Sequence, residues 1–183
     1  MYARTRLKTT DIAYISLMAA LIAICAWISI PTAVPFTMQT FGVFVAAGLL
    51  GPKRSSISIL VYMLLGAVGL PVFSNFTGGI GILLGKTGGY IVGFIFLALI
   101  EGWTARRYKG SMKALFLSMV VGIMICYAFG SAWFIMVYAA SSGAVGLMTV
   151  LGWCVFPFII PDLAKMALAL IVIRRVSPLL KLN

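Results

Sequence analysis

Apolar residues dominate this chain in long runs, which short polar or glycine-rich segments separate. The apolar runs cover residues 12–30, 39–51, 55–70, 88–105, 112–140 and 147–173. Because a helix needs about 20 apolar residues to cross a bilayer, this pattern predicts an all-α integral membrane protein with six transmembrane helices. At a rise of about 1.5 Å per residue, the second run is shorter than the hydrocarbon core and the fifth is longer. No internal repeat or linker interrupts the pattern, so residues 1–183 are expected to form one membrane-embedded domain.

Composition and charge placement agree with a membrane protein. Hydrophobic residues make up 63% of the chain and charged residues 9%, which excludes a soluble globular domain. The net charge of +11 would suit nucleic-acid binding, but 12 of the 14 basic residues lie in every second inter-helix segment or at the ends. They are Arg4, Arg6, Lys8, Lys53, Arg54, Arg106, Arg107, Lys109, Lys113, Arg174, Arg175 and Lys181. This positive-inside pattern predicts that both termini are cytoplasmic and that the basic residues contact membrane lipid, not nucleic acid.

Residues 71–90 form a glycine-rich segment between the third and fourth runs. Irregular backbone at membrane depth is tolerated only where protein buries it or where it lines a cavity, so we expect a ligand near this segment. Gly85-Lys86-Thr87 resembles the end of a phosphate-binding loop, which needs a glycine five residues before Gly85. Ile80 occupies that position, and we therefore reject nucleotide binding.

Ionisable residues inside the apolar runs are rare. Asp11 and Glu101 are expected at the cytoplasmic interface, with Glu101 beside Arg106. Asp162 lies 12 residues before Arg174, which is about 18 Å of helix, and so it is placed near the bilayer centre. Lys165 follows three residues later and can pair with Asp162 on the same helical face. The pair is either a structural ion pair or part of a ligand site, and the ligand site is favoured.

Other polar and aromatic residues are predicted to gather near this pair. The polar candidates are Thr37 and Gln39 before the second helix, Asn75 and Thr77 in the glycine-rich segment; the aromatic ones are Phe36, Phe73, Phe76, Tyr90 and Trp153. An apolar pocket with a few placed polar groups is typical of a small-molecule site. Lys86, the one basic residue assigned to the outer side, either attracts an anionic solute or is simply solvated. The chain has no histidine, which argues against histidine-ligated metals and histidine-dependent catalysis.

Several of these segments together resemble the BioY family, the biotin-binding S components of energy-coupling factor (ECF) transporters. They are Pro-Phe-Thr-Met-Gln-Thr (35–40), Ala-Gly-Leu-Leu-Gly (47–51), Gly-Leu-Pro-Val-Phe (69–73), Gly-Gly-Ile-Gly (78–81), Thr-Gly-Gly-Tyr (87–90) and Pro-Asp-Leu-Ala-Lys (161–165). They occur in the family's order over nearly the whole chain. One departure is Lys86, where the family usually has proline before Thr-Gly-Gly-Tyr.

The resemblance implies a six-helix S-component fold in a prokaryotic plasma membrane, with an outward-facing site closed by the loop between helices three and four. It implies a substrate-binding transport subunit and not an enzyme, with biotin as its ligand, no cofactor, and a partner module of one transmembrane coupling subunit and two cytoplasmic ATPases. Small residues of the first helix would contact the coupling subunit, which suggests this role for Ala19 and Ala23. Internal packing is the alternative role for those two alanines.

The chemistry of biotin then suggests a role for each candidate residue. Asp162 would accept hydrogen bonds from the ureido N–H groups, Lys165 would keep it ionised, and Gln39 and Asn75 would complete the ring contacts. The bicycle would be covered by Phe73, Tyr90 and Trp153, with Thr37 nearby, and the carboxylate tail would point toward Lys86. Three alternatives remain open: a membrane-embedded enzyme, an S component for another vitamin, and a helix-packing adaptor without a ligand.

Overall fold

A computed structural model describes residues 8–31, 34–108 and 110–180, and most of them are helical. Five long helices form a bundle: α1 (Thr9–Trp27), α2 (Gln39–Ala67), α4 (Gly88–Arg107), α5 (Met112–Ser142) and α7 (Phe156–Val176). Shorter elements connect them: β1 (Ser29–Ile30), β2 (Phe36–Thr37), η1 (Ser74–Phe76), α3 (Ile80–Leu84), α6 (Leu147–Cys154) and η2 (Ser177–Leu179). The strands β1 and β2 pair antiparallel, with Ser29 opposite Thr37.

The helix α2 is in fact two helices that fold back on each other. The side-chain amide of Gln39 donates a hydrogen bond to the Tyr62 hydroxyl, 23 residues further along the chain. A straight helix would separate these residues by about 35 Å, so the chain must reverse between them. The reversal is at Gly51, whose φ of 75° and ψ of 179° are not helical, and Pro52 starts the second half. Glycine adopts this left-handed φ without strain, and proline suits the first turn of a helix.

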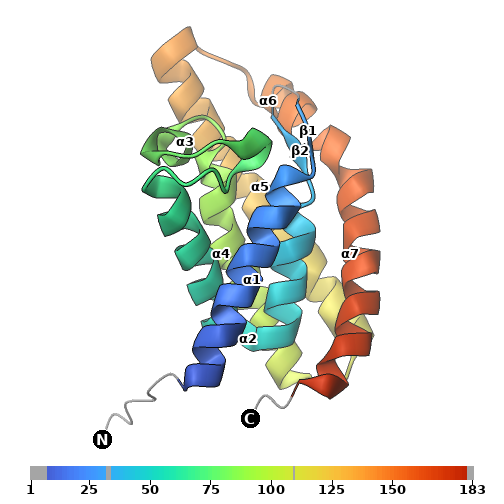
Figure 1. Cartoon of the computed structure of the whole chain (residues 1–183). Helices are drawn as coiled ribbons and strands as arrows, with labels where there is room; N and C mark the ends of the chain where they lie inside the picture. Colours follow the sequence, from blue (N-terminus) through green and yellow to red (C-terminus); the bar gives the residue numbers. More distant parts are fainter. Residues whose placement is uncertain (1–7, 32–33, 109, 181–183) are drawn as a thin grey trace, which may run out of the picture.

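This reversal produces six helical rods, as the hydrophobic pattern predicts. Five helical stretches of the described chain are long and apolar enough to cross a membrane, and the folded-back α2 contributes two of the rods (Figure 1). The predicted runs 39–51 and 55–70 are therefore the two halves of α2. A chain with six rods begins and ends on the same side of a bundle, and the start of α1 and the end of α7 do lie at the same end of it (Figure 1).

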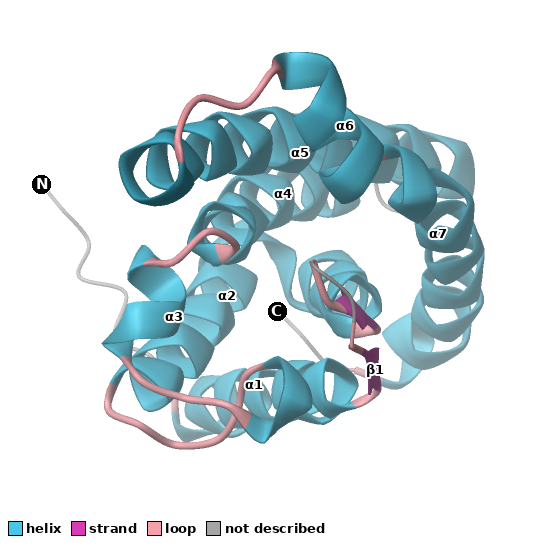
Figure 2. Cartoon of the chain, turned by 90° about the horizontal axis from the view of Figure 1, so that it is seen from above, coloured by secondary structure: helices cyan, strands magenta, loops and turns pink. Residues whose placement is uncertain are grey.

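The first half of α2 forms the centre of the bundle. Val43, Phe44, Ala46 and Ala47 point to different sides of this helix, yet all four are fully buried. A helix that is apolar all round is a buried helix. Figure 2 shows this half, directly below β2, enclosed by the other helices. This arrangement explains why a helix too short to span the bilayer by itself is stable.

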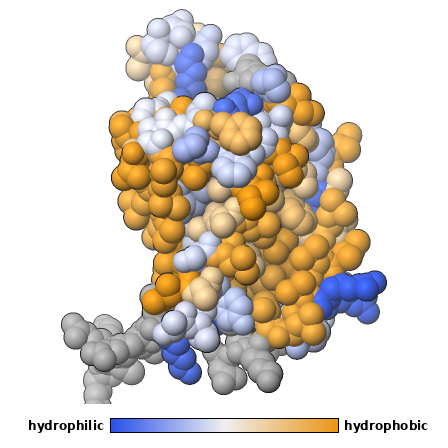
Figure 3. Space-filling model, viewed as in Figure 1, coloured by the Kyte–Doolittle hydropathy of each residue, from blue (hydrophilic) through white to orange (hydrophobic). Residues whose placement is uncertain are grey.

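The outer surface has the distribution of polarity that a membrane protein needs. Side chains such as Leu17 and Ile160 are largely exposed along the sides, and Figure 3 shows hydrophobic residues over most of the side face of the bundle. We call the end with the start of α1 and the end of α7 the terminal end. The opposite end, with β1, β2, α3 and α6, is the loop end.

Candidate functional site

A cavity opens inside the bundle at the loop end. The residues that line it come from α2, α4, α5 and α7 and from the shorter elements at the loop end: Val34, Pro35, Thr37, Gln39, Thr40, Phe73, Ser74, Ile82, Thr87, Tyr90, Ile91, Phe94, Ile123, Cys126, Tyr127, Cys154, Phe158, Asp162 and Lys165. Most of this lining is apolar or aromatic, and its two charged residues, Asp162 and Lys165, both belong to α7. A concave apolar pocket with a few convergent polar groups is the usual form of a small-molecule site.

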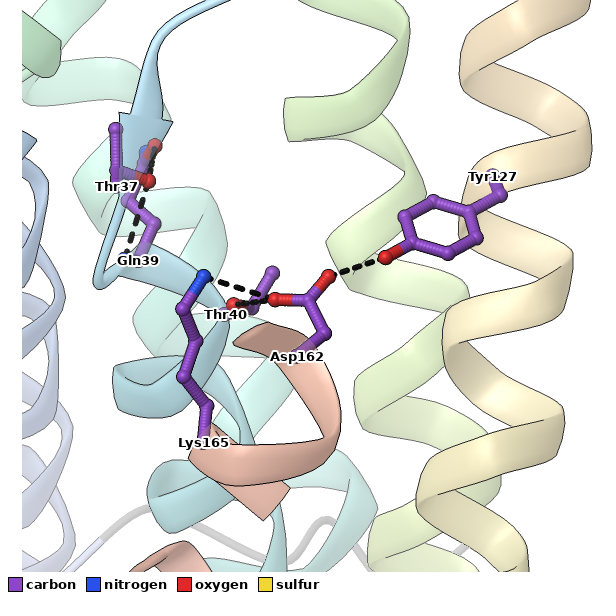
Figure 4. Close-up of polar contacts among 6 residues, drawn as sticks. All are labelled: Thr37, Gln39, Thr40, Tyr127, Asp162 and Lys165. Carbon is purple, nitrogen blue, oxygen red and sulfur yellow. Dashed lines mark hydrogen bonds and ion pairs between the residues drawn. The ribbon is translucent and has the colours of Figure 1, made fainter. Parts of the chain in front are cut away.

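The carboxylate of Asp162 is the centre of the polar network in this cavity. Lys165, one helical turn further along α7, places its ammonium nitrogen 2.8 Å from Oδ1. Thr40 of α2 donates its hydroxyl to the same oxygen at 2.9 Å, and the Tyr127 hydroxyl of α5 donates to Oδ2. Figure 4 shows these three donors converging on the carboxylate. Three helices thus supply donors to one carboxylate, which is the condition for keeping it charged in a buried place.

Burial makes the pair of Asp162 and Lys165 notable. Their residues are only 3% and 4% exposed. The Lys165 ammonium also lies 4.5 Å from the centre of the Phe36 ring, and this cation–π contact further stabilises its charge. Phe36 in turn stacks on Phe158 of α7, with ring centres 5.5 Å apart. The charged pair is therefore held between a polar network on one side and an aromatic wall on the other.

A second polar group lies at the start of α2, directly after the β1–β2 hairpin. The Thr37 hydroxyl donates to Gln39 Oε1 at 3.2 Å, and the Gln39 backbone N–H donates to Thr37 Oγ1 at 3.2 Å. The Gln39 amide nitrogen donates to Tyr62 in the second half of α2. A side-chain amide nitrogen carries two N–H donors, and only one of them is used in this way. Within the described part of the chain, Tyr62 is the acceptor of this side-chain nitrogen.

The aromatic wall of the cavity depends on glycines in the neighbouring helices. A Cβ at Gly66 would lie 2.0 Å from the Phe73 ring, and a Cβ at Gly130 would lie 2.2 Å from the Tyr90 ring. Both rings can therefore pack directly on the backbone of the neighbouring helix. The Tyr90 hydroxyl then reaches within 3.0 Å of Ser131 Oγ, so its polar end is paired while its ring faces the cavity.

Six of the nine ligand-binding candidates from the sequence line this cavity: Thr37, Gln39, Phe73, Tyr90, Asp162 and Lys165. Asn75 does not; its side-chain oxygen accepts a hydrogen bond from the Ser29 hydroxyl at 3.0 Å. Trp153 is 45% exposed and packs beside Tyr138, with ring centres 6.0 Å apart. Lys86 also turns to Tyr138, with its ammonium nitrogen 4.3 Å from the ring centre.

Sequence reasoning gave no role in ligand binding to Thr40 or Tyr127, the two uncharged donors to Asp162. Thr40 belongs to the same Pro-Phe-Thr-Met-Gln-Thr segment as the predicted site residues Thr37 and Gln39, so its position at the cavity could have been predicted from the sequence. Tyr127 follows Cys126 in the middle of an otherwise apolar helix. A tyrosine hydroxyl in such a place needs a hydrogen-bond partner, and Asp162 was the acid available at that depth. Among the described residues no cluster of His, Cys, Asp and Glu is suited to a metal ion.

The glycine-rich loop forms one wall of the cavity and is tied to helices on both sides. Phe73, Ser74, Ile82 and Thr87 contribute its share of the lining. On the α1 side, Trp27 Nε1 donates to the Pro71 carbonyl at 2.8 Å, and the same indole stacks on Phe76. On the α5 side, Trp133 Nε1 donates to the Gly85 carbonyl at 3.0 Å. The loop therefore has a defined position over the pocket, set by two indole anchors.

The two α1 alanines singled out in the sequence face the interior of this chain. Ala19 and Ala23 are 3% and 7% exposed, and α1 comes so close to α2 that a Cβ at Gly42 would lie 3.2 Å from the Ile22 Cα. The small residues on the outer face of α1 are Ala13, Ser16 and Ala20. Ala19 and Ala23 thus have the internal packing role that the sequence left as the alternative.

Comparisons with known proteins agree along almost the whole chain. Residues 2–182 match the BioY family. A probable biotin transporter BioY of Pyrococcus horikoshii is 37% identical over 93% of this chain and 98% of its own length. The biotin transporter BioY of Thermotoga maritima is 40% identical over 89% of this chain and 93% of its own length. A crystal structure of the S-component for biotin from an ECF-type ABC transporter superposes with a TM-score of 0.83 at 27% identity, covering 97% of this chain and 95% of that one.

Proposed function

This chain belongs to the BioY family, and from that premise we propose that it is the biotin-binding S component of an ECF-type transporter. It is a multi-pass protein of a prokaryotic plasma membrane and a substrate-binding transport subunit, not an enzyme. The observation that carries the proposal is the Asp162 carboxylate, held by donors from three helices at the wall of an apolar cavity.

The polar network suits the ureido ring of biotin. A carboxylate offers about four acceptor positions, and the three protein donors to Asp162 leave one for a ureido N–H. The second amide N–H of Gln39 and the remaining protons of the Lys165 ammonium can donate to the ureido carbonyl. The apolar bicycle then lies against Phe73 and Tyr90. Hydrogen bonds to charged groups are the stronger ones, so most of the specificity should come from Asp162.

We place the loop end outside the cell and the terminal end in the cytoplasm. Lys8, Arg54, Arg106 and Arg174, all near the terminal end of their helices, support this orientation through the positive-inside rule. The glycine-rich loop then covers an outward-facing cavity, and opening it admits biotin. In this arrangement Asn75 and Lys86 fasten the loop to β1 and α5 instead of contacting biotin, and the biotin carboxylate lies under the loop.

The partner module would be the transmembrane coupling subunit and the two cytoplasmic ATPases of an ECF transporter. Small residues on a lipid-facing helix surface let another helix approach closely. We therefore assign the coupling contact to Ala13, Ser16 and Ala20 on the outer face of α1, because Ala19 and Ala23 are buried. The cavity itself needs no ATPase to bind its ligand.

A calorimetric titration tests the proposed ligand. The full chain is purified from cells grown without biotin and titrated with biotin, and with lipoate as a control that shares the carboxylate tail but lacks the ureido ring. We expect saturable one-to-one binding of biotin and no binding of lipoate. Equal binding of the two compounds, or heat from neither, would overturn the assignment of biotin as the ligand.

A further inference from the structure

The second buried acid of the bundle, Glu101, has surroundings unlike those of Asp162. The sequence suggested an interfacial position beside Arg106, but Glu101 is 0% exposed. It faces the first half of α2, where a Cβ at Gly48 would lie 3.2 Å from its Oε1. Neither carboxyl oxygen has a hydrogen-bond partner among the described residues. The side chain is therefore not at the surface of the protein but is turned into the packed contact between α4 and α2.

The charged side chains near the terminal end of every neighbouring element are engaged elsewhere or lie at the surface. Those of described residues are Lys8 and Asp11 at the start of α1, Lys53 and Arg54 on α2, Arg106 and Arg107 on α4, Lys113 on α5, and Arg174 and Arg175 on α7. Arg54 pairs with Asp11 at 2.8 Å, and Arg106 donates to the Leu50 carbonyl at 3.3 Å. None of these groups makes a hydrogen bond to Glu101. The group closest to Gly48 from α7 is the apolar side chain of Ile173.

Without a cation or a donor, an ionised carboxylate in this place would be strongly unfavourable, and a neutral carboxylic acid would be much less so. We propose that Glu101 is a proton-binding site, and that only its protonated form is compatible with the close packing of α2 on α4 at the terminal end. This inference uses only residues outside the biotin cavity. It is therefore independent of the ligand proposed for the loop end.

The same geometry suggests what happens when the proton leaves. Gly48 lines an open cavity at the terminal end, together with Arg54 and Arg106 among others, and a Cβ at Gly48 would lie 3.2 Å from Glu101 Oε1. Breaking the O–H bond would transfer the proton to water and leave a carboxylate with a charge to compensate. The nearest compensation is the basic lining of this cavity. Ionisation should therefore draw the side chain past Gly48 and loosen the packing of α2 on α4.

Infrared spectroscopy tests the protonation state directly, because this chain has only three Asp and Glu residues. The purified full chain is measured at neutral pH in a maltoside detergent, which has no carbonyl group of its own. We expect a carboxylic acid C=O band that is absent from Glu101→Gln and still present in Asp11→Asn, the matched acid with a paired carboxylate. A wild-type spectrum without this band, or a band that survives in Glu101→Gln, would overturn the proposal.

Thermal unfolding at different pH values tests the consequence for stability. A group that is protonated in the folded protein and ionised in the unfolded chain stabilises the fold fully in acid, and this contribution is lost as the pH rises. The melting temperature of the wild type should thus fall relative to Glu101→Gln as the pH increases. Parallel curves for the two proteins would contradict the proposal. Biotin titrations of the same samples report the loop end separately, and Glu101→Gln should bind biotin as the wild type does.

Discussion

The two ends of the bundle bury a carboxyl group in opposite ways. At the loop end, Asp162 receives hydrogen bonds from Lys165, Thr40 and Tyr127 and lines an open cavity. At the terminal end, Glu101 is more deeply buried, and no described residue donates to it. Burial alone therefore does not identify a ligand site. A buried acid with donors and adjacent space can exchange a donor for a ligand, whereas a buried acid without donors can only bind a proton.

Removing Lys165 should have the largest effect of any change at either end. Lys165→Met leaves the Asp162 charge buried without its cation, which typically costs about 3–5 kcal/mol. We expect a loss of this size in the free energy of unfolding, measured by denaturant titration in detergent. The double variant Asp162→Leu with Lys165→Met removes both charges and should recover most of the stability without recovering biotin binding.

The matching change at the terminal end provides the contrast. Glu101→Leu removes an acid that has no cation to leave behind, so its stability should lie within about 1 kcal/mol of the wild type. Equal losses in the free energy of unfolding for Lys165→Met and Glu101→Leu would contradict the difference between Asp162, which is paired with a cation, and Glu101, which is not.

The affinity for biotin should depend on the charge of Asp162. Asp162→Asn keeps the shape of the side chain but replaces a charged acceptor, and a hydrogen bond to a charged group contributes about 1.5–3 kcal/mol. We expect the dissociation constant for biotin to rise about 10- to 150-fold by calorimetry. The melting temperature of the same sample shows whether the variant is folded. An unchanged dissociation constant in a folded variant would show that Asp162 makes no direct contact with biotin.

A methyl group added beside Glu101 should test how tightly the terminal end is packed. In Gly48→Ala the new Cβ would lie 2.4 Å from Ile173 Cδ1 and 3.2 Å from Glu101 Oε1. Overpacking of this kind costs about 1–3 kcal/mol, and we expect the free energy of unfolding to fall by about 1–2 kcal/mol. Gly152→Ala in α6 is the control, because nothing lies within 4 Å of that Cβ. Equal stability of Gly48→Ala and Gly152→Ala would mean that the contact between α2 and α4 around Glu101 can rearrange to accommodate an added methyl group.

The sequence predicted the helices better than it predicted the positions of side chains in loops. Hydropathy located all six rods because each must be apolar over its length, and the buried pair of Asp162 and Lys165 followed from their spacing and depth. The burial of Glu101 was missed, because Arg106 five residues later suggested a charged interface. Only the fold shows that Arg106 donates to the Leu50 carbonyl, whereas Glu101 packs beside Gly48 without a hydrogen-bond partner among the described residues.

For residues in the glycine-rich loop, too, the sequence did not predict the direction of the side chains. Asn75 and Lys86 lie in the segment that walls the cavity, so their polar side chains were expected to face a ligand. Asn75 instead contacts Ser29 of β1, and Lys86 contacts Tyr138 of α5. Sequence proximity places a residue in the right loop, but the direction of its side chain depends on backbone angles. Asn75, for example, has a φ of 55°, which hydropathy does not encode.

The smallest expected effect is that of replacing Lys86. This substitution tests whether Lys86 slows the release of biotin by tying the glycine-rich loop to α5. The Lys86 ammonium lies 4.3 Å from the Tyr138 ring centre and 3.4 Å from Ser142 Oγ, so it ties the loop to α5. A cation–π contact at an exposed site contributes about 0.5–1 kcal/mol. In Lys86→Ala we therefore expect biotin to dissociate about 2- to 5-fold faster, measured by chase with unlabelled biotin. Lys86→Arg should restore the slow rate because it keeps a cation over the ring. If Lys86 contacted the biotin carboxylate instead, the alanine variant would lose its preference for biotin over biotin methyl ester, and this loss would count against the tether.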